Sequence, residues 1–469
     1  MNHTSPANTE VLRNRLKIPS LSFYLVFFFV SGLFFLRFTG VFVLLFIGGI
    51  TLSILYIFLS QKTTRIGLLI LSNYVFWFLS GFLVGSIKPG DLISVAFLNG
   101  DGRIFIYYLP LISLSFMHVR LHDIGYIERL LKVMACLILG ATILYYAGAI
   151  STVHFLGFFT HHTGAGTFIG INLIVLAITG ISRKKKQNIF FSILLIVPFV
   201  AAGSREAMFG LFCVALWYVA KKRKLVLILW LFVFCFIILL LAPYFAPIAY
   251  ERTISLVNPE TFETAKQGLE SIVWEPGYER KWGGGLWNVV WRVVYWRYAL
   301  SLIIKSPLIG VGFGRFNDYN LHFSGFENLA YVAVGGKNRF DVLQAHNSYL
   351  HFMSEVGILG MIFILSVWWM LYKRVSALES VSAAHPLIKG HAEAAQGIVV
   401  FCLSAAFFGH ALGAPTTGII AMSLLGWYSS IDLHALRLFL ETNRVEKISL
   451  KIERRPFINN RFYSVPDQA

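Results

Sequence analysis

The sequence is poor in charge and in cysteine. Only 13% of its 469 residues are charged, against 57% that are hydrophobic, so there is too little polar surface to cover an apolar interior in water. The four cysteines, Cys136, Cys213, Cys235 and Cys402, each lie in an apolar run, with no CxxC spacing. This pattern argues against a soluble globular protein, a disulfide framework and a cysteine zinc site.

Patterns typical of metal and nucleotide sites are missing as well. His154, His161 and His162 have no carboxylate beside them, and adjacent histidines rarely converge on one ion. The loops between the apolar runs contain no Asp-x-Asp pair. The GxGxG run after Pro307 follows no strand and has the wrong spacing for a dinucleotide fingerprint. We therefore expect neither a metal nor a cofactor.

Long hydrophobic runs are what the sequence has instead. A membrane-spanning helix needs roughly 17–25 mostly apolar residues, and about twelve runs approach this length. They are 18–36, 41–60, 66–86, 103–119, 130–150, 165–182, 188–203, 206–220, 225–244, 348–371, 393–412 and 414–432. The sequence thus predicts an all-α integral membrane protein with about twelve transmembrane helices.

The basic residues predict how these helices are oriented. The formal net charge is +17, and basic blocks such as 183–186 and 221–224 lie between apolar runs. With both termini in the cytoplasm, most of these blocks fall on the cytoplasmic side, in agreement with the positive-inside rule. We expect nine spans within 1–244, an outer loop or cap over 245–347, three spans within 348–432 and a basic cytoplasmic tail over 433–469.

The outer loop contains a predicted interfacial helix. Trp287, Trp291 and Tyr295 recur at i, i+4 and i+8, which places aromatic rings along one side of a helix at headgroup level. Pro307 is expected to end this helix. Arg292 lies on the same helix, where it either faces a site or anchors lipid headgroups. Arg297 and Lys305 are weaker candidates for the same role.

The turn between the runs 188–203 and 206–220 is expected at the outer end of a hairpin. If Ser204 caps the second helix, Arg205 occupies its first turn, where the helix dipole disfavours a cation. A bound anion would reverse that sign, because free backbone N–H groups and a guanidinium together suit phosphate. The alternative is that Arg205 extends toward lipid headgroups.

His346 precedes the run 348–371, with Asn347 or Ser348 as its N-cap. The positive helix end would keep this histidine neutral, as a general base requires, although an interfacial structural histidine is the alternative. Further along the run, Glu355 is expected to make a structural hydrogen bond. Gly357 is expected to allow close helix packing.

Together these motifs resemble the O-antigen ligase and O-antigen polymerase superfamily over roughly 190–370. The matching segments are Gly203-Ser204-Arg205, Arg292-x-x-x-Trp296, Pro307-Leu308-Ile309-Gly310-Val311-Gly312 and His346-Asn347-Ser348-Tyr349-Leu350. The resemblance implies a GT-C-like inner-membrane glycosyltransferase with a periplasmic active site. It also implies a donor glycan carried on undecaprenyl pyrophosphate and no metal.

Carried over by position, the resemblance assigns Arg205 and Arg292 to the donor pyrophosphate and His346 to the catalytic base. It leaves the acceptor open between lipid A core, a second lipid-linked glycan and a protein. The segment 261–285 matches no part of the family pattern. A transporter or flippase of lipid-linked glycans and a non-catalytic export scaffold remain alternatives, although we find no internal repeat typical of transporters.

Overall fold

The computed structural model describes most of the helical body and part of the connecting segments. The described residues are 20–34, 48–49, 51–52, 65–83, 103–117, 119, 123–149, 159, 162–223, 284–316, 345–383, 385–412, 415–434, 436–438 and 440, with isolated positions between 240 and 263. Within them, every regular element is a helix, which confirms the all-helical prediction for this part of the chain.

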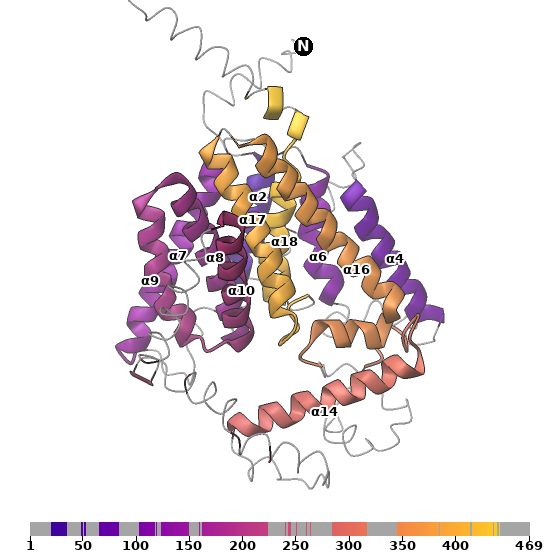
Figure 1. The fold of residues 1–469 in the computed structure, drawn as a ribbon. Helices are drawn as coiled ribbons and strands as arrows, with labels where there is room; N and C mark the ends of the chain where they lie inside the picture. The colour runs from indigo at the N-terminus through magenta and orange to yellow at the C-terminus, as the bar shows by residue number, and fades with distance from the viewer. Residues whose placement is uncertain are drawn as a thin grey trace, which may run out of the picture.

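The helices form one bundle, and α14 (Gly284–Lys305) and the first part of α16 (Ser348–Val381) lie across one end of it (Figure 1). Their bounds are α2 Leu21–Phe34, α4 Arg65–Leu83, α6 Arg103–Ser115, α7 Ile124–Tyr146, α8 His162–Arg183, α9 Lys186–Ala201, α10 Arg205–Lys222, α14 Gly284–Lys305, α16 Ser348–Val381, α17 Pro386–Ala405 and α18 Pro415–Ser429.

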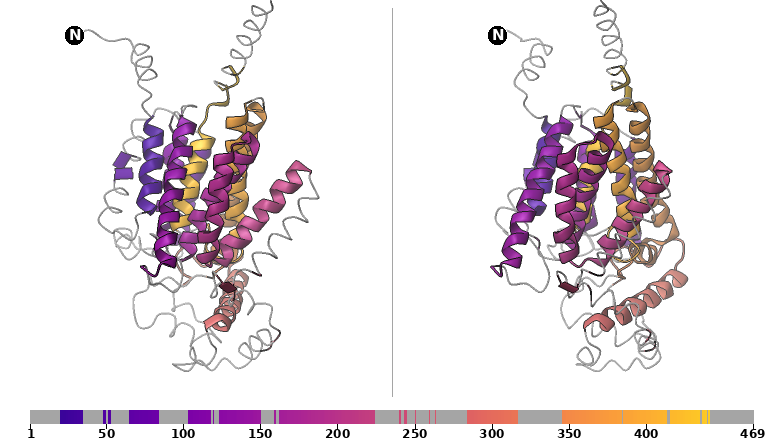
Figure 2. Two further views of the ribbon diagram at one scale, coloured as in Figure 1. Left: turned by 90° about the vertical axis from the view of Figure 1, so that its left-hand side faces the viewer. Right: turned by 60° about the vertical axis from the view of Figure 1, so that its left-hand side comes forward.

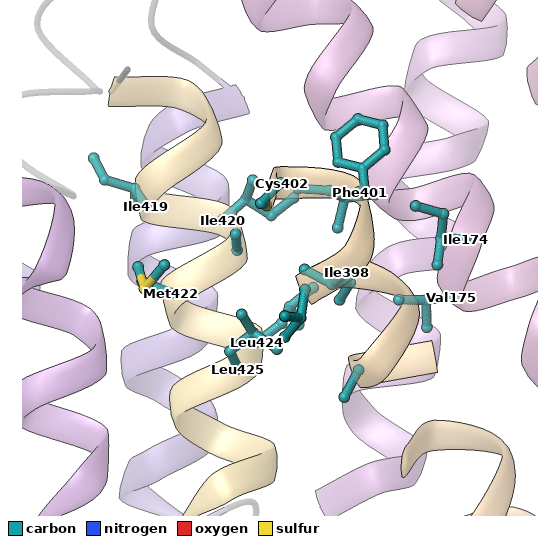
Figure 3. Close-up of a cluster of buried hydrophobic side chains, with 14 of the residues drawn as sticks. Ile174, Val175, Ile398, Phe401, Cys402, Ile419, Ile420, Met422, Leu424 and Leu425 are labelled. Atoms are coloured by element: carbon teal, nitrogen blue, oxygen red, sulfur yellow. The ribbon is translucent and has the colours of Figure 1, made fainter. Parts of the chain in front are cut away.

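The core of the bundle lies where α8, α17 and α18 meet. Figure 3 shows Ile174 of α8, Ile398 of α17 and Leu424 of α18 pointing toward one another, and all three are buried. Gly166 lets the start of α10 approach α8, since a Cβ there would come within 2.5 Å of the Ser204 Cβ. Burial of large aliphatic side chains at this junction fixes how the central helices pack.

Two of the described helices, α8 and α16, are long and apolar enough to cross a membrane by length and composition. The count of twelve spans stays a prediction, because the expected spans 41–60 and 225–244 lie almost wholly outside the described residues. The span expected at 393–412 is shifted in the structure. Its helix α17 begins at Pro386, a residue favoured in the first turn of a helix, and ends at Ala405.

Helix α16 bends sharply at Gly357, which has φ +67° and ψ −173°. Gly357 leaves room for close packing, since a Cβ there would lie 2.3 Å from the Leu308 carbonyl, but the segment packed against it is 307–312 rather than a helix. The bend frees backbone groups on both sides, and the 307–312 segment binds them. These bonds are Val311 N to Ser354 O at 2.9 Å, Gly312 N to Glu355 O at 2.9 Å, Ile358 N to Pro307 O at 2.9 Å and Leu359 N to Leu308 O at 3.1 Å.

The transverse helix is α14, which crosses one end of the bundle in Figures 1 and 2. It ends at Lys305, just before Pro307, as the sequence predicts. A small separate core attaches it to the start of α16. That core consists of Tyr298, Ala299, Leu302, Val311, Phe316 and Ala345. Because α14 joins the bundle through buried apolar contacts, its residues hold fixed positions relative to α16.

Ion pairs gather at the other end of the bundle. The buried Glu128 carboxylate of α7 contacts Lys132 at 3.0 Å, Arg183 at 2.6 Å and Lys185 at 2.5 Å. Arg374 donates to the Ser429 and Ile431 carbonyl oxygens, both at 2.9 Å, and so binds the C-terminal end of α18. The basic blocks around 183–186 and 221–223 therefore lie a helix length from Arg205, about 24 Å for the 16 residues of α9.

Candidate functional site

The turn between α9 and α10 positions Arg205. Gly203 has φ +65° and terminates α9, a conformation that glycine adopts at little cost. The Ser204 hydroxyl then accepts a hydrogen bond from Ala207 N at 3.4 Å, which makes it the N-cap that the sequence predicts. Arg205 is consequently the first residue of α10, at the positive end of the helix dipole.

Arg292 reaches the same place from α14. Its guanidinium is half-buried, and burial lowers its pKa while the Glu206 carboxylate opposes that change. Among the described residues, none forms a hydrogen bond or a close ion pair with the Arg292 guanidinium. Glu206, one residue after Arg205, interacts electrostatically with both arginines. Arginines on two different helices therefore act electrostatically on one carboxylate.

His346 lies in the short link before α16. Its φ of +48° is left-handed, which is uncommon for a residue with a side chain, and Asn347 caps α16 by accepting from Leu350 N at 3.1 Å. The His346 ring lies 6.3 Å from the Tyr295 ring, centroid to centroid. Tyr295 follows Arg292 by three residues and therefore shares its face of α14. One face of α14 thus carries Arg292, which interacts with Glu206, and Tyr295, which lies near His346.

The turn 406–412 contacts both the start of α16, which follows His346, and Glu206, which follows Arg205. Ser348 N donates to the Ala406 and Gly409 carbonyl oxygens at 2.8 and 3.1 Å. The Ser348 hydroxyl donates to Gly409 O at 3.1 Å and accepts from Leu412 N at 3.2 Å. On its other side, Gly409 contacts Glu206 so closely that a Cβ there would lie 1.3 Å from the carboxylate Oε2. Glu206 and Ser348, two residues after His346, therefore rest on the same turn.

The three residues singled out in the sequence, Arg205, Arg292 and His346, are thus assembled at one end of the bundle. Both arginines interact electrostatically with Glu206, and the His346 ring lies 6.3 Å from that of Tyr295 on the same helix as Arg292. Two guanidinium groups at a helix N-terminus suit an anion with several oxygens, such as a diphosphate. An imidazole at the same end of the bundle suits proton transfer from a hydroxyl group.

Buried polar residues lie next to the His346 link in the first turns of α16, against the turn 406–412. His351 lies one turn into α16, is 2% exposed and interacts electrostatically with His346. Its ring packs edge-to-face on His410 at 4.6 Å. The Glu355 carboxylate accepts from Phe316 N at 3.1 Å, which is the structural hydrogen bond expected from the sequence, although its partner is the turn after α14.

Sequence reasoning missed Glu206, His351 and His410 as neighbours of the site. Their positions depend on contacts between segments far apart in the chain, and only the adjacency of Glu206 to Arg205 offered a signal. The weaker candidates Arg297 and Lys305 lie on exposed faces of α14. The described residues contain no group of three His, Cys, Asp or Glu side chains placed for a metal.

Comparison with known proteins identifies a family for the middle of the chain. Residues 190–365 match the family model described as O-antigen ligase, a stretch that includes Arg205, Arg292 and His346. No curated protein matches the chain significantly. The match confirms the resemblance to the O-antigen ligase and polymerase family over residues 190–365.

Proposed function

We propose that this protein transfers a glycan from undecaprenyl pyrophosphate to an acceptor hydroxyl at the periplasmic face of the bacterial inner membrane. The observation that carries the proposal is that Glu206 interacts electrostatically with both Arg205 and Arg292 and contacts Gly409, in the turn to which Ser348 is hydrogen-bonded. The family match supports glycosyl transfer involving lipid-linked glycans at a coarser level.

The proposed reaction is a single displacement. The acceptor oxygen attacks the anomeric carbon, and the bond from that carbon to the pyrophosphate oxygen breaks. The bonding electrons leave with the pyrophosphate, whose growing charge Arg205 and Arg292 stabilise. His346 takes the proton of the attacking hydroxyl. Attack opposite the leaving group inverts the anomeric configuration, and the step requires no metal.

The sidedness of the site follows from the same proposal. In it, residues 1–244 and 348–432 form the membrane part, 245–347 form the periplasmic cap, and 433–469 form the cytoplasmic tail. The distance between Arg205 and the basic blocks at the other ends of α9 and α10 supports this orientation. Sequestration of the functional charges at one end also favours an enzyme over a transporter, whose sites lie near the bilayer midplane.

The experiment is glycan transfer by purified protein in nanodiscs that contain the undecaprenyl-pyrophosphate-linked donor. Replacing His346 by Ala abolishes transfer but leaves donor binding intact. His346→Asn does the same and also tolerates the left-handed backbone at this position, so misfolding does not explain the loss. Lys305→Ala, an exposed change on α14, is the control and keeps full activity. Full transfer by both His346 variants would show that His346 is not the general base.

The acceptor is identified in the same assay by offering each candidate separately. Lipid A core as the productive acceptor makes the protein a ligase, and a second lipid-linked glycan makes it a polymerase. In cells, deletion gives a parallel answer on a glycan gel. Lipid-linked polymer that never reaches lipid A indicates a ligase, whereas capped single repeats indicate a polymerase.

A further inference from the structure

A cavity lies at the end of the bundle opposite α14, away from the proposed transfer site. Its volume is about 490 Å³, within the range of small-molecule sites. Three helices line it: the last turns of α10, the C-terminal part of α16 and the first half of α17. The lining residues are Trp217, Ala220, Lys221, Tyr372, Ser376, Glu379, Ser380, Ala383, Lys389 and Gln396. None of them takes part in the proposed transfer site.

The charges lining this cavity leave one cation unmatched. Lys221 Nζ contacts Glu379 Oε2 at 2.5 Å and Gln396 Oε1 at 2.6 Å, and Gln396 Nε2 donates to Glu379 Oε2 at 2.7 Å. This triangle pairs the lysine with the acid. The Lys389 ammonium group has no ion pair or hydrogen bond with any residue in the described part of the chain, although its backbone N–H donates to His385 O at 3.0 Å. The cavity therefore has a net positive charge, and an anionic group is the ligand that balances it.

The face of α16 that lines the cavity continues as an apolar stripe. Tyr372, Ser376 and Ser380 recur every four residues, and the same face runs back through exposed apolar residues toward the bend. Those are Ile358, Ile362, Leu365 and Trp369, with exposed fractions of 40%, 57%, 39% and 59%. One helix face thus joins a hydrocarbon-facing stripe to a positively charged cavity.

Aromatic side chains mark the level of the cavity. Lys221 Nζ lies 5.0 Å from the Trp217 ring centroid, and Lys373 Nζ lies 4.8 Å from that of Trp369. Tryptophan beside lysine is typical of residues at the boundary between headgroups and hydrocarbon. The cavity therefore lies where a lipid headgroup would be, at the end of a stripe on which an acyl chain would lie.

We propose that this cavity binds one anionic phospholipid, with its phosphate at Lys389 and an acyl chain along Ile358, Ile362, Leu365 and Trp369. The proposal does not depend on the glycosyl transfer proposed above. The Ser376 and Ser380 hydroxyl groups, which donate to the Tyr372 and Ser376 carbonyl oxygens at 2.8 and 3.1 Å, turn to the phosphate when the lipid binds. A neutral lipid gains no comparable pairing, so the site distinguishes lipids by headgroup charge.

The test is native mass spectrometry of the full-length protein in a neutral detergent, titrated with phosphatidylglycerol or phosphatidylcholine. The wild type retains one phosphatidylglycerol, about tenfold more tightly than phosphatidylcholine, as loss of one charged hydrogen bond predicts. Lys389→Ala removes this preference. Lys186→Ala is the matched control, because Lys186 is an exposed lysine in the first turn of α9 at the same end, and it leaves the preference unchanged.

A second variant acts through volume rather than charge. Ser376→Phe fills the cavity and lowers retention of phosphatidylglycerol while Lys389 is still present. Inorganic phosphate, added at millimolar concentration, fails to displace the lipid. Equal retention of both lipids by the wild type, or equal behaviour of the Lys389 and Lys186 variants, would overturn the proposal. Binding of inorganic phosphate in place of the lipid would also overturn it and would identify a site for free phosphate.

Discussion

At the residue scale, Glu206 is a carboxylic acid within the proposed anion site that the sequence did not predict. It interacts electrostatically with Arg205 and Arg292 and rests against Gly409. A carboxylate in this position balances the two guanidinium groups in the absence of a substrate. It also opposes a diphosphate, because like charges at short range raise the free energy of binding.

Replacing Glu206 by Gln therefore tightens the binding of inorganic pyrophosphate. We expect roughly a tenfold lower Kd, which corresponds to about 1.4 kcal/mol. Isothermal titration calorimetry of the purified protein measures this change. Asp432→Asn is the control, since it removes an exposed carboxylate at the far end of the bundle and leaves the Kd unchanged. Weaker pyrophosphate binding by Glu206→Gln would mean that the carboxylate instead holds the arginines in place.

At the scale of elements, the bend in α16 and the 307–312 segment form one unit. Gly357 and Gly310 have φ values of +67° and +71°, and each lies against the backbone of the other segment. A Cβ on Gly357 would come within 2.3 Å of the Leu308 carbonyl. The unit fixes the start of α16, and with it His346, relative to α14.

Gly357→Ala consequently destabilises the protein. The left-handed backbone and the clash with Leu308 together cost about 2–4 kcal/mol, and thermal unfolding in detergent shows a lower midpoint. Gly140→Ala is the matched control. Gly140 lies in α7, where an added Cβ would meet nothing within 4 Å, so its replacement leaves stability equal or slightly raised. Equal midpoints for the two variants would show that the bend is not constrained.

Local signals predicted the elements around the site, whereas contacts between distant segments did not follow from the sequence. Ser204 and Pro307 locate the start of α10 and the end of α14, because capping and the missing proline N–H act over a few residues. The bend at Gly357 depends on partners in 307–312, and the place of Glu206 depends on Gly409. Neither partner is near in sequence, so neither contact was predictable.

At the scale of the whole molecule, the two ends of the bundle differ in chemistry. The proposed transfer site and α14 lie at one end, and the ion pairs of Glu128 and the cavity beside Lys389 lie at the other. In the proposed orientation, the positive-inside rule predicts that the end with the basic blocks faces the cytoplasm. One orientation in the membrane must therefore place the transfer site on the periplasmic side and both the basic blocks and the proposed lipid site on the cytoplasmic side.

Labelling of single cysteines with a membrane-impermeant maleimide tests that orientation. In a background without native cysteines, Arg297→Cys on α14 reacts in intact spheroplasts, because its side chain is exposed on the proposed periplasmic side. Lys186→Cys, exposed at the opposite end, reacts only after the membrane is permeabilised. The reverse pattern, or reaction of both cysteines from outside, would contradict the proposed topology.

The central claim is that Arg205 and Arg292 bind the same anion, and a double-mutant cycle on pyrophosphate affinity tests it most directly. The Kd is measured for the wild type, Arg205→Gln, Arg292→Gln and the double variant. Two groups on one diphosphate predict a coupling free energy of about 0.5–3 kcal/mol between the two substitutions. Strictly additive losses, or no loss in either single variant, would show that the arginines serve separate sites and would contradict the claim.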